Sequence, residues 1–429
     1  MKTFLSLIES QKSFPLKSQG KSMWPILQEN DIIYFKKTSF FKIAVNDLIV
    51  FRKKRRIICH RVIYKRKSFV ITKGDNSFKN DGKIYKRQIL GRVYQVKRNG
   101  RFFNPETLYL IQSTHYFNEI VKIKSEFDRQ KINYLFLKGL PLHLYFEGAH
   151  PKRIYADCDV LIDKKDFEKA QNILSEFGYK KVDLHWSKFG RKLMKEEIEA
   201  TFFKTINGFS VVFDIHPKLG ELAIVHLGYL DNLYSEKQSG KLVDYFLSDK
   251  KKVIINGERF FILNDFDLIL YLALHLFHHN FAGAFRYQFL DTVIRKHKRR
   301  LKSIYSQIKK LVQEYELEGF VYPVFLLLKK YYKTPVPANF LIEIKPKKKY
   351  QLWYINTKVL KKNIFDDQTR IKAGVERFVN LFILSSNNIF KKILIVFNLQ
   401  IIYAVVFVLF FKIRSFILRL KLKFKQIDV

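Results

Sequence analysis

Apolar residues in the first hundred positions come in short runs that polar residues and turn formers interrupt. Val, Ile, Phe and Tyr dominate the runs, and Lys, Asn, Asp or Gly separate them. Short runs of β-branched and aromatic residues between turn signals are typical of strands. The runs are 32–35, 48–51, 57–62 and 69–71. We therefore expect a small β-rich domain over residues 1–105.

From about residue 134 the pattern changes to alternating strand-like and helical segments. Asn207-Gly208 lies between two strand-like runs and is a strong hairpin signal. The expected strands are 134–137, 153–163, 199–206 and 209–215, and helical stretches end near Gly148 and Gly178. The alternation predicts an α/β (α+β) domain over residues 106–335, followed by a helical, basic and apolar region over 336–429.

A serine in the first domain has the companions that a nucleophile needs. Ser22 stands in Gly-Lys-Ser-Met-Trp-Pro, and His60 and Asp81 follow in later segments. A hydroxyl is a weak nucleophile unless a base takes its proton, and a third group orients the base. Alone, the serine motif often marks only a turn, and His60 would be a solvated strand histidine. The ordered series favours a catalytic set.

This series resembles signal peptidases of the endoplasmic-reticulum and archaeal type, in which a His serves a Ser-Met-x-Pro serine. The matching stretches are 20–25, 46–51, 58–62, 74–81 and 91–93. The resemblance implies a serine endopeptidase without a cofactor that cleaves a peptide or protein precursor. Ser22 is then the nucleophile, His60 the base and Asp81 the orienting acid. Asp75, in a Gly-Asp-Asn turn, is the alternative acid.

Two features limit this interpretation. Cys59 precedes His60, but side chains alternate along a strand, so a Cys nucleophile ranks below the serine. Residues 1–19 carry Lys and Glu, with no apolar run of about 20 residues. They also lack the continuous apolar segment and the small-residue cleavage site of a signal peptide. We therefore expect that the N-terminus does not translocate the domain.

Paired carboxylates mark the second domain. Asp157 and Asp159 are two apart on an expected strand and share a face, while Cys158 points to the opposite layer. Asp214, in Asp-Ile-His216, would add a third carboxylate from the hairpin. Such oxygen ligands suit Mg²⁺ carrying a nucleoside triphosphate. The alternative is an ordinary solvated surface.

The second domain resembles the family of uncharacterised nucleotidyltransferase-like proteins over residues 106–330. The residues that carry the resemblance are Lys138-Gly139, Arg153, Asp157-x-Asp159, Phe177-Gly178-Tyr179 and Asp214-x-His216. It implies metal ligands at Asp157, Asp159 and Asp214, a nucleotide site at Lys138, Gly139 and Arg153, and Mg²⁺ with a nucleoside triphosphate as cofactors. Lys138-Gly139 replaces the usual Gly-Ser loop. A catalytically inactive nucleotide- or peptide-binding protein in a maturation or polysaccharide pathway is therefore the alternative.

Histidines follow the apolar run 268–276. His275 and His279 are four apart and would share a helix face, a spacing that metals use. A structural or substrate-facing helix is favoured over zinc, because no third ligand is evident. Arg286 and Asp291 in the next helix are expected to pair with each other or to face a phosphate.

The net charge of the chain indicates which partners it attracts. The chain has 79 Lys plus Arg against 39 Asp plus Glu, a net charge of +40, which attracts nucleic acid or anionic lipid. No nucleic-acid module is recognisable, so no specific nucleic acid is expected. Two cysteines provide no disulfide framework.

Residues 393–411 carry no formal charge and are flanked by basic residues on both sides. The segment is just long enough to span a bilayer, although core helices also reach this length. Because both flanks are basic, orientation cannot be inferred from charge. We expect association with an anionic membrane surface, peripheral or through this segment, with the main body at the cytoplasmic face. A wholly cytoplasmic chain is the alternative.

Overall fold

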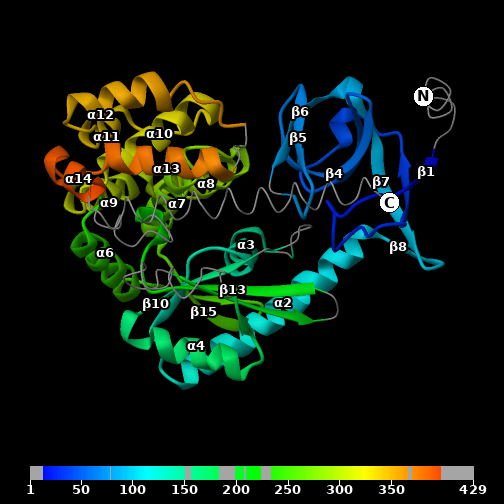
Figure 1. Cartoon of the computed structure of the whole chain (residues 1–429), viewed down its shortest axis with the longest axis horizontal. Coiled ribbons are helices and arrows are strands. Elements are labelled where there is room, and N and C mark those ends of the chain that lie inside the picture. Colours follow the sequence, from blue (N-terminus) through cyan, green and yellow to red (C-terminus); the bar gives the residue numbers. More distant parts are fainter. Residues whose placement is uncertain are drawn as a thin grey trace.

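Two β-sheets and a helical region make up the molecule, as the computed structural model shows (Figure 1). The structure describes residues 13–77, 79–148, 150, 155, 157–182, 199–206, 209–223, 233–365 and 370–397. The expected β-rich N-terminal region followed by an α/β region is confirmed.

The first sheet is antiparallel and curled, with strand order β1-β2-β7-β3-β4-β5-β6 and β8 beside β7. Its strands are β1 Ser13–Lys17, β2 Ile32–Lys36, β3 Leu48–Lys53, β4 Arg56–Lys65, β5 Phe69–Lys73, β6 Asn80–Tyr85, β7 Ile89–Arg98 and β8 Arg101–Phe103. The register shifts where β7 meets β2 and β3, and where β5 meets β4 and β6. Such bulges bend a strand and increase its twist, which suits a curled sheet.

The second sheet is mixed, with order β11-β12-β13-β10-β9-β15-β14. Its strands are β9 Tyr134–Phe136, β10 Cys158–Ile162, β11 Lys180–Lys181, β12 Ala200–Ile206, β13 Phe209–His216, β14 Lys251–Ile255 and β15 Glu258–Ile262. β12 and β13 form the expected antiparallel pair, and Ile206 faces Phe209 across the turn. The strand expected over 153–163 ends one residue earlier, because Asp163 leaves the sheet and accepts a hydrogen bond from Lys165 N. Residues 153, 154 and 156 of that prediction lie outside the described residues.

Helices cover the second sheet and form a bundle beside the first (Figure 1). They are α2 Pro105–Arg129, α3 Leu140–Glu147, α4 Phe167–Glu176, α6 Glu236–Ser248, α7 Asp265–His278, α8 Ala284–Lys296, α9 Leu301–Glu314, α10 Glu318–Tyr332, α11 Ala338–Glu343, α12 Lys349–Tyr354, α13 Arg370–Leu384 and α14 Ile389–Val396. Asn104 caps α2 by accepting from Glu106 N, and Pro105 takes the first turn. α2 runs from beneath the first sheet to the second (Figure 1).

The first sheet and the helical bundle share a core. Tyr64 of β4 packs on Phe365, with ring centroids 5.3 Å apart. Asn80 Nδ2 donates to Phe365 O at 3.2 Å, and Arg66 donates to Tyr331 O. These contacts join residues at least 265 positions apart in the sequence, so the regions are packed together.

The apolar tail segment 393–411 is described only as far as residue 397, and the rest of that prediction lies outside the described residues. Within the described ranges, no helix combines the length and the apolar character needed to cross a bilayer.

Asp267 predicts a pH dependence of stability. It is fully buried in the first turn of α7, and burial, with Asp249 nearby, raises its pKa from 3.8 to about 8. The folded chain therefore holds this proton more tightly than the unfolded chain, so stability falls as the pH rises from about 4 to about 8. Asp267→Asn should remove that part of the loss. We expect the melting temperature of the variant minus that of wild type to be several degrees higher at pH 8 than at pH 5. An equal difference at both values would contradict the prediction.

Candidate active sites

Three side chains of the first sheet form a hydrogen-bonded series. His60 Nε2 lies 2.9 Å from Ser22 Oγ, and His60 Nδ1 lies 2.7 Å from Asp81 Oδ2. Ser22 lies in the turn after β1, His60 on β4 and Asp81 at the start of β6. The side chains of His60 and Asp81 are only 11% and 13% exposed. The structure thus brings together the residues that the sequence suggested as nucleophile, base and acid.

Asp81 is held by groups that the sequence analysis missed. Thr72 Oγ1 donates to Asp81 Oδ2 at 2.8 Å, and Lys53 Nζ donates to the Asp81 carbonyl oxygen. Thr72 is fully buried on β5, the strand paired with β6. Thr72 directly follows the predicted run 69–71, and a threonine beside an apolar run is too common a feature to have signalled this role.

The second candidate for the acid lies elsewhere. Arg61 Nε donates to Asp75 Oδ1 at 2.7 Å, and Arg61 Nη2 donates to Asp75 Oδ2. The acid in contact with His60 is therefore Asp81. Cys59 packs beside the cluster of Met23 and Leu48, and burial raises the pKa of its thiol to about 12. A thiol that holds its proton this tightly is a poor nucleophile at neutral pH.

The second site is a cluster of three carboxylates. One oxygen each of Asp157, Asp159 and Asp214 lies within 4.8 Å of the other two. β10 and β13 are parallel neighbours, and their register sets Asp159 directly beside Asp214. Asp157 immediately precedes β10. Cys158 faces the apolar core instead.

Two basic side chains already contact one carboxylate oxygen of this cluster. Asp159 Oδ1 lies 3.0 Å from Lys138 Nζ and 3.2 Å from His216 Nε2. Burial would raise the pKa of Asp159, but Lys138 and His216 keep it below its ordinary value. Burial and the neighbouring Asp159 raise the pKa of Asp214 to about 6. Lys138, expected at the nucleotide, therefore contacts one of the three clustered carboxylates.

The unpaired oxygens fit a hard cation. Asp159 Oδ2 and Asp214 Oδ1 are buried without a hydrogen-bond partner, and buried carboxylate oxygens ordinarily have one. An all-oxygen set suits Mg²⁺. Gly139 has φ +101, and a Cβ there would lie 3.3 Å from the Asp157 carbonyl oxygen. A side chain would be strained at this position. Arg153 lies outside the described residues.

The histidines of α7 bind protein groups. His275 Nδ1 lies 3.3 Å from Glu221 Oε1, and His278 Nδ1 lies 3.2 Å from Gly220 O. Burial lowers the pKa of His275 to about 4, so its imidazole is neutral at neutral pH. Among the residues that the structure describes, the three aspartates are the one group arranged to hold a metal. Zinc between His275 and His279 gains no support from this arrangement.

Asp291 pairs with a different arginine from the one considered in the sequence. Arg295 Nε lies 2.9 Å from both Asp291 oxygens, one helical turn onward, and Thr334 Oγ1 donates to Asp291 at 2.7 Å. The expected pairing of Asp291 with Arg286 is therefore wrong, and Asp291 forms a helix-stabilising pair with Arg295 instead. The alternative, a phosphate contact, stays a prediction.

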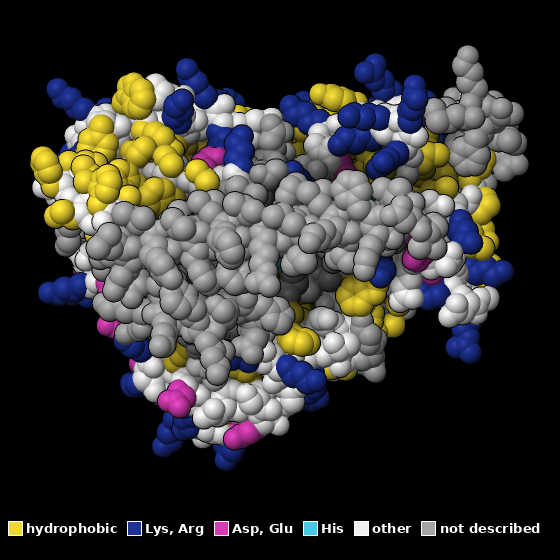
Figure 2. All heavy atoms as spheres, viewed as in Figure 1, with side chains coloured by type: hydrophobic (Ala, Val, Ile, Leu, Met, Phe, Trp, Pro, Cys, Tyr) yellow, Lys and Arg dark blue, Asp and Glu magenta, His cyan; other side chains and the backbone are white. Residues whose placement is uncertain are grey.

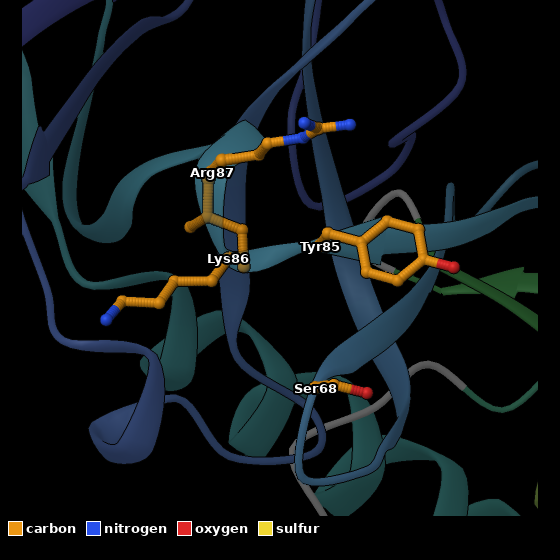
Figure 3. A pocket seen from close by; sticks show the side chains of 5 residues that line it. Ser68, Tyr85, Lys86 and Arg87 are labelled. Carbon is orange, nitrogen blue, oxygen red and sulfur yellow. The ribbon is translucent and has the colours of Figure 1, made fainter.

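A hollow of about 600 Å³ opens elsewhere on the first sheet (Figure 3). Ser68, Tyr85, Lys86, Arg87 and Ile89 line it. Lys86 and Arg87 point away from one another in this view. The hollow lies at the far end of β6 from Asp81, and none of the candidate residues lines it.

The mixed sheet, its covering helices and the carboxylates on adjacent strands define a nucleotidyltransferase-like domain. The family described as uncharacterised nucleotidyltransferases matches residues 102–333, more than half of the chain, and the protein belongs to this family. This confirms the resemblance inferred for the second domain. No curated protein and no solved structure matches the chain significantly. The family match begins as the first sheet ends.

Proposed function

We propose that the second domain transfers a nucleotidyl group from a nucleoside triphosphate to an acceptor. The observation that carries the proposal is the convergence of Asp157, Asp159 and Asp214, with buried unpaired oxygens on two of them, in a member of a nucleotidyltransferase family. Mg²⁺ bound there would neutralise the triphosphate and align it for in-line attack.

The protein's own groups then have defined tasks. The acceptor's nucleophilic atom attacks the α-phosphorus, the bond from the α-phosphorus to the β-bridging oxygen breaks, and pyrophosphate leaves. Lys138 and His216 orient Asp159 through its Oδ1 and leave Oδ2 for the cation. Gly139 lets the chain pass close to the Asp157 backbone. Lys138 in place of a Gly-Ser loop also contributes a positive charge near the phosphates.

Pyrophosphate release tests this function. Each nucleoside triphosphate is incubated with Mg²⁺ and fractionated cell extract as the source of acceptor, with the label on the α-phosphate. The proposal expects the α-label in the product and pyrophosphate in solution. In a parallel incubation the label is on the γ-phosphate. Its transfer to the acceptor would identify a phosphotransferase instead.

A second function is supported by the geometry of the first site. Ser22, His60 and Asp81 are joined at 2.9 and 2.7 Å, the order and spacing of a serine peptidase triad. We therefore assign serine endopeptidase activity on a peptide or protein precursor to the first domain. This assignment rests on these residues and not on the family match, which starts at residue 102.

The steps follow from the contacts. With Nδ1 protonated and bonded to Asp81, His60 Nε2 accepts the Ser22 proton as Oγ attacks the scissile carbonyl carbon. The C–N bond breaks, and the leaving amine takes that proton from His60. Water then hydrolyses the acyl-enzyme with His60 again as base. Backbone N–H groups near Ser22 are assigned to the oxyanion.

The C-terminal region supports a proposal on location. α14 and the residue after it turn an apolar face outward, and Figure 2 shows hydrophobic side chains gathered over α14 and its neighbours. The exposed positions are Ile389, Phe390, Ile393, Leu394 and Phe397. They repeat at helical spacing and share one face, whereas Lys392 is buried. The sequence stays uncharged from there to residue 411, and six Lys or Arg follow by residue 425. We assign this face to an anionic lipid surface on the cytoplasmic side.

Vesicle flotation checks this assignment. The full chain should float with vesicles that contain phosphatidylserine, and much less with phosphatidylcholine alone. Replacing Phe390 and Leu394 by Ser should lower binding by about tenfold or more, because each exposed side chain would lose its apolar burial. Phe41→Ser is the control, since Phe41 is 78% exposed on the first domain. Equal flotation of the double variant and wild type would exclude the lipid assignment. If wild type is a dimer in solution and the double variant is a monomer, the face binds a second copy of the chain instead.

A further inference from the structure

The second domain contributes a side chain to the surroundings of Ser22. Tyr109 lies near the start of α2, within the region matched by the family, and is 2% exposed. Its hydroxyl oxygen accepts a hydrogen bond from Arg61 Nη2. The guanidinium carbon of Arg61 also lies 4.0 Å from the centre of the Tyr109 ring. Arg61 follows His60 on β4 and is thus held by a helix of the other domain.

Arg61 in turn fixes a loop. Its Nε and Nη2 donate to the two oxygens of Asp75, and both side chains are nearly buried, at 4% and 6% exposure. Two parallel hydrogen bonds between planar groups fix orientation as well as distance. Burial would lower the pKa of Arg61, but Asp75 and Tyr109 raise it, so the arginine stays charged.

The loop that carries Asp75 is packed directly behind Ser22. Asn76 N donates to Ser22 O at 2.8 Å, and Asp75 N contacts Met23 Sδ at 3.4 Å. A Cβ on Gly74 would come within 2.5 Å of Ser22 O and 3.0 Å of His60 Nε2. This loop is therefore in close contact with the Ser22 backbone and the His60 ring, so a displacement of the loop moves Ser22.

Apolar packing reinforces the same connection. Met23, which follows Ser22, belongs to a buried cluster with Tyr109 and Phe209. Phe209 opens β13, the strand that carries Asp214. Two side chains of the nucleotidyltransferase-like domain therefore belong to the same buried cluster as the residue after Ser22.

We infer that Tyr109 is a positioning residue for Ser22, acting through Arg61, Asp75 and the loop, so that the first site is complete only with the second domain in place. The inference rests on the proposed peptidase function. Arg61 Nη1 also donates to Asn46 O at 3.1 Å, and Arg61 Nη2 donates to the Tyr109 hydroxyl. The hydroxyl hydrogen bond is the directional part of the Tyr109 contact, because packing against the ring face alone does not fix the guanidinium at one position. A shift of the nucleophile by about 1 Å lowers the rate of bond formation with little effect on reagent binding.

The test compares two tyrosines of one helix. Tyr109→Phe removes the hydroxyl bound to Arg61 and keeps the ring. Tyr116→Phe is the matched control, because Tyr116 is fully buried on α2 and its hydroxyl donates to Val212 O at 2.6 Å, away from Ser22. Acylation of Ser22 by a fluorophosphonate is followed in the full chain over a pH series and fitted as KI and kinact.

Tyr109→Phe should lower kinact by roughly tenfold, with KI and the midpoint of the pH profile unchanged, because the His60–Asp81 pair is untouched. Its melting temperature should fall no further than that of Tyr116→Phe. Asp75→Asn, which weakens the same connection from the other side, should also lower kinact.

Equal kinact in Tyr109→Phe and Tyr116→Phe, or wild-type kinact in Asp75→Asn, would overturn the inference while Ser22 labelling stands. If wild-type protein is not labelled at Ser22 at all, the peptidase function fails and this inference fails with it.

Discussion

Ser22→Ala should abolish both covalent labelling by a serine-directed acylating probe and cleavage of any precursor peptide. The Oγ atom supplies the bond to the probe, and the alanine has no atom to replace it. His60→Ala should slow the reaction by about 10⁴-fold or more, because no other base is in contact with Ser22 Oγ among the hydrogen bonds found for it. Asp81→Asn should cost roughly 10³- to 10⁴-fold, since the imidazole loses the carboxylate that fixes its tautomer.

Ser68→Ala is the control, because Ser68 is an exposed serine between β4 and β5 that lines the separate hollow. Labelling rates should match wild type. Full cleavage by Ser22→Ala would exclude the assignment. Equal rates for Asp81→Asn and wild type would show that His60 works without an orienting acid.

The second large effect concerns cation and nucleotide binding. Mg²⁺ with a nucleoside triphosphate should raise the melting temperature of the wild-type chain by several degrees, because a ligand that binds only the folded state at one hundred times its Kd stabilises by about 2.7 kcal/mol. Replacing Asp157 and Asp159 by Asn should remove this rise. Without cation the double variant should melt below the wild-type temperature, because Asp159→Asn leaves Lys138 and His216 without the carboxylate that they contact at 3.0 and 3.2 Å.

Asp163→Asn provides the control, because Asp163 lies just beyond the opposite end of β10 and caps a turn. This variant should keep the whole rise. Ser22 labelling should be unchanged in the double variant, as neither aspartate is part of the connection from Tyr109 through Arg61 and Asp75 to Ser22. A melting curve indifferent to Mg²⁺ and every nucleotide would leave the domain as a scaffold without nucleotidyl transfer.

The sequence was informative where the signal is local or ordered along the chain. Short apolar runs indicated the strands of the first sheet, and Asn207-Gly208 indicated the pairing of β12 with β13. Residues two apart predicted that Asp157 and Asp159 share a side while Cys158 enters the core, as observed.

Contacts between distant segments could not be predicted in the same way. The parallel pairing that sets Asp159 beside Asp214 joins strands more than fifty residues apart. The contacts of Arg61 with Tyr109 and of His275 with Glu221 cross 48 and 54 residues. Such pairs depend on how the sheets and helices pack, and no periodicity or turn motif encodes them. Asp291 illustrates this, because Thr334, one of its two partners, lies 43 positions away in the sequence.

The central claim is that one chain carries two separate reactive sites. A crystal structure of the full chain, treated with a fluorophosphonate and soaked with Mg²⁺ and a non-hydrolysable nucleoside triphosphate, tests both at once. The account predicts a covalent adduct on Ser22 Oγ and a cation about 2.1 Å from oxygens of Asp157, Asp159 and Asp214, with the triphosphate on that cation. An adduct on another residue, together with a carboxylate cluster that holds neither cation nor nucleotide, would contradict it.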